Sequence, residues 1–170
     1  MRILATFDGS KFSESTLPQL LMMADLPTAE LIFLGVADEP HGRLQRRGGE
    51  RPAEVIASTT PVIMDVPEPQ WAENKGQAVE RRRAQLNDYL QDIAAKFPPG
   101  ARVQIKTDVS DDAADAIVDC ARQHAVDVIV MATHSRKGLA HALFGSTTEN
   151  VVRSGVAPVL VVHPAEEPGT

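Results

Sequence analysis

Cysteine is nearly absent from this chain, and its scarcity excludes two common ways of stabilising a small protein. Cys120 is the only cysteine among 170 residues. A single thiol cannot form an internal disulfide, and it cannot supply a zinc site built from several thiolates. The fold must therefore be stabilised by burial of apolar side chains. With 43% hydrophobic residues, a chain of this length can form one domain with a sizeable core.

Positive charge, aromatic side chains and long apolar runs are also scarce. The formal net charge is -6 at pH 7, and the chain holds one Trp and one Tyr. Nucleic acid is an unsuitable partner, because its phosphates repel an acidic chain and its bases find few rings to stack on. No apolar run approaches the roughly 20 residues that cross a bilayer. The amino-terminal RILATF run is too short for a signal peptide, so we expect a cytoplasmic protein without a membrane partner.

Short apolar runs alternate with helical patterns along the chain. Strands are predicted at 2–7, 30–36, 102–109, 126–132 and 158–163, and helices at 14–26, 77–97, 111–124 and 146–153. Ser13 is expected to cap the first helix, and Ser110 or Asp111 the third. Strands alternating with helices predict an α/β fold, with a doubly wound, Rossmann-like, five-stranded parallel sheet in three α/β/α layers.

One segment interrupts this alternation. Residues 38–75 hold five prolines and three glycines but few periodic apolar positions, and they are too long for an ordinary loop. We therefore predict a single domain over residues 1–165, with an irregular insertion at about 38–75. Residues 166–170 form a polar tail.

The stretch MATHSRKGLAHALFGSTTENVV, residues 131–152, joins a predicted strand to a predicted helix. Parallel sheets bind ligands beyond the carboxyl ends of their strands, which is where this stretch begins. A helix starting at Gly145 and Ser146 would offer free backbone N–H groups to a phosphate. Thr147 adds a hydroxyl, and Arg136 adds charge nearby. The alternative is that Ser146 merely caps a helix, and the residues alone leave this choice open.

Three stretches carry a resemblance to the universal stress protein family: RILATFDGS, LIFLGVADEP and DVIVMATHSRKGLAHALFGSTTENVVRSGVAPVLVV. The resemblance implies a five-stranded parallel sheet of the adenine nucleotide alpha hydrolase-like class. ATP-binding members carry the motif G-x2-G-x9-G-[ST]. Its terms fall at Ala132, Ser135, Gly145 and Ser146, so the spacing and the last pair are kept while the first two glycines are replaced.

The resemblance also implies a set of site residues. The expected nucleotide-binding residues are Thr6, Asp8, Val36, Met131, Ala132, Ser135, Arg136, Gly145, Ser146 and Thr147. Asp8 matches an acidic residue near ribose or a phosphate-bound Mg, although an Asp-Gly turn explains it equally well. Val36 matches a position whose main chain meets adenine, whereas its side chain fits a simple core position.

The implied function is binding of ATP or AMP by a stress-response sensor or regulator, with slow hydrolysis at most. Known dimers of the family imply a homodimer through the edge strand 158–163. Two alternatives stay open: an interaction protein that binds no nucleotide, and an adenylating or pyrophosphatase enzyme of a related fold. The second would resemble S-G-G-x-D-S after the first strand, and the stretch FDGSKFS lacks the paired glycines.

Overall fold

The computed structural model describes residues 1–39, 75–133 and 145–163. Its centre is a sheet of five strands in the order β3-β2-β1-β4-β5, and every neighbouring pair is parallel. The strands are β1 (Arg2–Phe7), β2 (Glu30–Ala37), β3 (Arg102–Val109), β4 (Val128–Ala132) and β5 (Val159–Val162). The predicted α/β class and five-stranded parallel sheet are confirmed.

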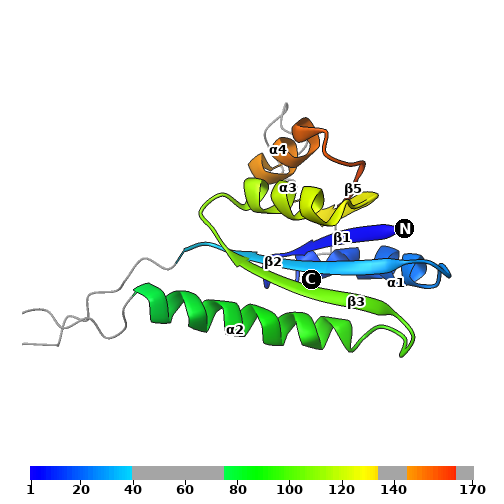
Figure 1. The fold of residues 1–170 in the computed structure, drawn as a ribbon, viewed down its shortest axis with the longest axis horizontal. Helices are drawn as coiled ribbons and strands as arrows, with labels where there is room; N and C mark the ends of the chain where they lie inside the picture. The colour runs from blue at the N-terminus through cyan, green and yellow to red at the C-terminus, as the bar shows by residue number, and fades with distance from the viewer. Residues whose placement is uncertain (40–74, 134–144, 164–170) are drawn as a thin grey trace, which may run out of the picture.

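Helices cover both faces of this sheet. They are η1 (Ser13–Thr16), α1 (Leu17–Ala24), α2 (Lys75–Ala94), α3 (Ala113–His124) and α4 (Ser146–Ser154). Helices α3 and α4 lie on the side of the sheet opposite to α2 (Figure 1). Leu20 of α1 and Leu90 of α2 share one buried cluster, while Ile117 of α3 and Val151 of α4 belong to the other. The three predicted layers are thereby confirmed.

The strands are buried because their side chains alternate between two apolar cores. In β1, Ile3 and Ala5 face the cluster under α1 and α2, whereas Leu4 faces the cluster under α3 and α4. In β2, Gly35 allows α2 to approach closely, since a Cβ there would lie 3.1 Å from Cδ1 of Leu90. This packing fixes the carboxyl ends of β1 and β2, where the chain leaves the sheet.

Two predicted helix caps are wrong. Ser13 lies inside η1, and its hydroxyl donates to the carbonyl oxygen of Ser10 at 2.8 Å instead of accepting from a helix N–H. Helix α3 is capped by Asp112, whose Oδ1 accepts from the N–H groups of Ala114 and Asp115 at 3.0 Å. The turn favours Asp112 over its neighbours because Ser110 Oγ accepts from the Asp112 N–H at 3.2 Å.

Helix α4 ends at Ser154, one residue beyond its predicted end at residue 153. Gly155 adopts φ +62 and closes the helix, a conformation that glycine reaches without steric cost. No helix within the described ranges is long and apolar enough to cross a membrane. Most of the predicted insertion and the predicted tail lie outside the described residues.

Candidate functional site

A cavity of about 300 Å³ opens at the carboxyl ends of β1, β2 and β4. The winding of the sheet reverses at β1, which pairs with β2 on one side and β4 on the other. Ligands of doubly wound sheets bind at such a switch point. The described lining residues are Thr6, Phe7, Asp8, Phe12, Ser13, Val36, Ala113, Ile117, Met131, Ala132, Gly145, Ser146, Thr147 and Thr148.

The cavity brings together every predicted site residue that the structure describes. The ends of the strands contribute Thr6, Asp8, Val36, Met131 and Ala132, and the start of α4 contributes Gly145, Ser146 and Thr147. Ser135 and Arg136 lie outside the described residues. Residues from distant parts of the sequence thus line one cavity.

The amino-terminal end of α4 faces this cavity without a side-chain cap. Gly145 is the N-cap residue, with φ -70 and ψ 163, and it has no side chain that could cap the first turn. Ser146 is therefore the first helical residue, and the alternative that it merely caps the helix is wrong. The first N–H groups of a helix have no internal acceptor and carry the positive end of its dipole. This end of α4 can accept an anion.

Helix α3 also begins at the cavity, through Ala113 and Ile117, but its start is already neutralised. The Asp112 carboxylate accepts hydrogen bonds from two N–H groups of the first turn of α3. It also places negative charge at the positive end of the helix dipole. Among the described residues, a carboxylate therefore bonds to the first N–H groups of α3 but not to those of α4.

Asp8 places a carboxylate at the mouth of the same cavity. Burial raises the pKa of Asp8, but the hydrogen bonds from the hydroxyl and the backbone N–H of Ser10 help to lower it by more, so the net pKa lies below its ordinary value. Asp8 is thus ionised at neutral pH. Gly9 follows with φ +82, so the predicted Asp-Gly turn is present and does not conflict with a place in the cavity.

Ala132 occupies the first motif position without backbone strain. Among the non-glycine residues that the structure describes, only Ala125 has a positive φ, so alanine at 132 has no left-handed backbone to strain. Gly145 likewise has an ordinary φ, and a Cβ added there would meet no described atom within 4 Å. No described residue therefore requires glycine at 145.

Several lining residues were missed by sequence reasoning. Phe12 and Ser13 follow the Asp-Gly turn, and Ala113 and Ile117 come from the first turns of α3. The right-handed crossover from β3 to β4 carries α3 over this end of the sheet, which a search for motifs does not detect. Val36 was expected both to line the nucleotide site and to fill a core position. The structure has it in both places, because the residue is 8% exposed, belongs to the core cluster under α3 and α4, and lines the cavity.

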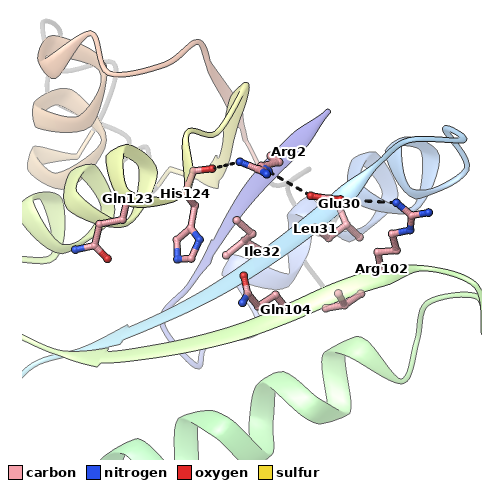
Figure 2. Close-up of a pocket in the computed structure, with 9 residues that line it drawn as sticks. Arg2, Glu30, Leu31, Ile32, Arg102, Gln104, Gln123 and His124 are labelled. Atoms are coloured by element: carbon pink, nitrogen blue, oxygen red, sulfur yellow. Dashed lines mark hydrogen bonds and ion pairs between the residues drawn. The ribbon is translucent and has the colours of Figure 1, made fainter.

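A second cavity, of about 360 Å³, lies at the opposite end of the sheet (Figure 2). Arg2 Nε lies 3.2 Å from Glu30 Oε2, and an Arg102 nitrogen lies 3.7 Å from the other Glu30 oxygen. These ion pairs are exposed. The backbone N–H of Arg2 donates to the Asp127 carboxylate, and a guanidinium nitrogen of Arg2 donates to the carbonyl oxygen of His124. This cavity lies at the amino ends of the strands, and no described helix begins among its lining residues.

Comparison with known proteins decides the family. The model of the universal stress protein family matches residues 44–163. This chain belongs to the universal stress protein family. It is 44% identical to universal stress protein MJ0577 of Methanocaldococcus jannaschii over 48 residues, which are 28% of this chain and 30% of that relative. The chain therefore matches less than a third of the length of that curated relative.

Solved structures share the fold of this universal stress protein across nearly the whole chain. The structure of MJ0577 has a TM-score of 0.67 at 24% identity, covering 98% of this chain and 97% of that one. A universal stress protein from Burkholderia pseudomallei has a TM-score of 0.61 at 22% identity, covering 96% of each chain. A universal stress protein solved in complex with cAMP has a TM-score of 0.54 at 18% identity, covering 97% and 98%.

Proposed function

We propose that this universal stress protein binds an adenine nucleotide, ATP or AMP, and acts as a stress-response sensor or regulator. The observation that carries the proposal is the uncapped start of α4 inside the cavity at the switch point. A phosphate placed there accepts hydrogen bonds from backbone N–H groups without a dedicated lysine. The hydroxyls of Ser146 and Thr147 can add two further donors.

The remaining walls suit a nucleoside. Ile117 and Met131 are buried and apolar, and they line the cavity beside the main chain of Val36, where adenine can lie. The volume of about 300 Å³ is at the lower end of the usual range for ligand sites, about 300–1,000 Å³. A universal stress protein of the same fold has been solved in complex with cAMP, which supports an adenine-and-phosphate ligand.

Asp8 limits where the phosphates can lie. An ionised carboxylate repels a phosphate unless a cation lies between them or the carboxylate meets ribose hydroxyls instead. No group of three or more His, Cys, Asp or Glu side chains in the described ranges could hold a metal ion. Mg would therefore need nucleotide phosphates among its ligands, with Asp8 as a protein ligand.

Hydrolysis should be slow or absent. Among the described lining residues, Asp8 is the only acid or base, and its lowered pKa makes it a weak base for activating water. The site thus favours binding of a nucleotide over its hydrolysis.

Isothermal titration with ATP, AMP and adenosine, each with Mg or with EDTA, tests the proposal. ATP and AMP should bind more tightly than adenosine, because only they reach the start of α4. Absence of binding by all three would favour an interaction protein that uses no nucleotide. Release of pyrophosphate that depends on a second substrate would favour an adenylating enzyme.

We also propose a homodimer through β5, the edge strand of the sheet. Within the described residues, strand β5 pairs with β4 alone, and its sequence VLVV is apolar and uncharged. An edge of this kind favours pairing with another chain, and a two-fold axis would place the same strand on both sides. The cytoplasmic location stays part of this proposal.

A further inference from the structure

Thr133 links the edge strand of the sheet to the start of α4. It directly follows β4, and only 1% of it is exposed. Its backbone N–H donates to the carbonyl oxygen of Val162 at 3.1 Å. Its Oγ1 accepts from the backbone N–H of Gly145 at 3.4 Å, twelve residues further along the chain. One buried residue thus bonds to β5 and to the N-cap residue of α4 at the same time.

This hydroxyl restrains the N-cap residue of α4. Gly145 is the residue type with the greatest backbone freedom, and no side chain in the described ranges bonds to the first turn of α4. The carbonyl oxygen of Gly145 accepts from the Glu149 N–H at 2.9 Å, so Gly145 is held on one side by the helix and on the other by Thr133. Its orientation sets the direction of the N–H groups that follow.

We propose that Thr133 is a positioning residue for the phosphate, and that it makes the cavity selective for phosphorylated adenine ligands. This inference rests on the proposed function. The hydroxyl holds Gly145, the residue that directly precedes the N–H groups of Ser146 and Thr147 at the start of α4. It acts through the start of α4 alone, so its contribution reaches the phosphate and not the adenosine part of the ligand.

Thr133→Val is the discriminating substitution. Valine keeps the size and the branching of a side chain that is fully buried, but it removes the acceptor for the Gly145 N–H. Thr133→Ser keeps the hydroxyl and loses a methyl group, so it serves as the conservative control. Neither change removes the backbone N–H that bonds to Val162.

Titration calorimetry with ATP, AMP and adenosine on the three proteins tests the inference. Thr133→Val should weaken ATP and AMP about three- to tenfold and change adenosine affinity by less than about twofold. Thr133→Ser should restore phosphate-ligand affinity to within about twofold of wild type. Equal losses for adenosine and ATP would indicate a purely structural role and overturn the proposal, as would unchanged ATP affinity. Where Thr133→Val does not fold, Thr133→Cys, which retains the size with a weak acceptor, takes its place.

A second measurement needs no nucleotide. Hydrogen exchange of the Gly145 amide, followed by NMR in the ligand-free protein, should be faster in Thr133→Val than in Thr133→Ser or wild type. Equal exchange rates would overturn the restraint itself. Failure of wild type to bind any adenine ligand would instead overturn the proposed function, and the exchange rates would still decide whether Thr133 holds Gly145.

Discussion

Ser10 directs two donors at one oxygen of Asp8: its hydroxyl lies 2.6 Å and its backbone N–H 2.9 Å from Oδ1. Both bonds favour the ionised carboxylate, and they help to hold the pKa of Asp8 below its ordinary value despite partial burial, which acts in the opposite direction. The turn after β1 therefore fixes a negative charge at the mouth of the cavity.

This relationship predicts a pH dependence of stability. A group whose pKa is lowered by folding adds stability above its unfolded pKa, here the ordinary value of 3.8, and that stability is lost as pH falls through the folded value. The advantage of wild type over Asp8→Asn in free energy of unfolding should thus be constant near neutral pH and should shrink below about pH 4. Urea denaturation across this range measures it.

Ser10→Ala is the matched control for the same experiment. It removes the hydroxyl donor and leaves the backbone donor, so it should reduce the loss of stability at low pH without abolishing it. An advantage of wild type over Asp8→Asn that grows on acidification would contradict the assigned direction of the pKa shift.

Ser146→Ala should weaken ATP binding. The hydroxyl lines the cavity and does not cap α4, so its loss should leave the helix intact while removing one hydrogen bond to a charged group, about 1.5–3 kcal/mol or roughly tenfold or more in affinity. Ser154→Ala, at the other end of α4, removes a hydroxyl that donates to Val151 and should leave affinity unchanged. Titration of all three proteins checks this, and equal affinity for Ser146→Ala and wild type would rule out a direct role.

Ala132→Gly tests whether the alanine affects ligand binding through the space that its methyl group takes up or through strain in the backbone. Because φ at 132 is not positive, glycine relieves no strain and should cost about 0.5–1 kcal/mol of stability as a glycine within a strand. Removal of the methyl group leaves more room in the cavity that Ala132 lines, and this should strengthen ATP binding about two- to threefold. Denaturation and titration measure the two effects, and unchanged affinity would show that alanine is compatible with the ligand.

The sheet and the start of α4 could be predicted because their signals are local. Runs such as ELIFLGVA are apolar on both faces, as a central parallel strand requires, and Gly145 with Ser146 marks the start of α4. The cap of α3 could not, because Ser110, Asp111 and Asp112 are all acceptable caps. Only the turn that bonds Ser110 to Asp112 selects one of them.

The lining of the described cavity could be predicted only in part, because some of its residues are marked by local sequence signals and others are not. Asp8 directly follows β1 and Gly145 directly precedes α4, and the sequence pattern predicts both of these boundaries. Ile117 and Thr133 reach the site through the crossover of α3 and through a bond that spans twelve residues, and both depend on tertiary packing. Their side chains carry no pattern that distinguishes them from ordinary core residues.

The alternation of hydrogen bonds along β5 allows a sharp test of the dimer. The carbonyl oxygens of Pro158 and Val162 accept from Ile129 and Thr133, and Leu160, midway between them, faces β4 in the same register. The backbone N–H and C=O groups of successive residues in a strand face opposite edges of that strand. The N–H and C=O groups of Val161 therefore face the free edge of the sheet. A partner strand would bond to these groups.

Val161→Pro should therefore yield a folded monomer, while wild type is a dimer at micromolar concentration. Proline removes a donor that only the partner uses, and an edge strand accepts it on its open side. Leu160→Pro removes a donor directed at β4 and should destabilise the fold instead, because the sheet loses a ladder hydrogen bond. Circular dichroism separates these two outcomes, and light scattering gives the mass. A monomeric wild type across the micromolar range would contradict the dimer, whereas a dimeric, folded Val161→Pro would place the interface away from β5.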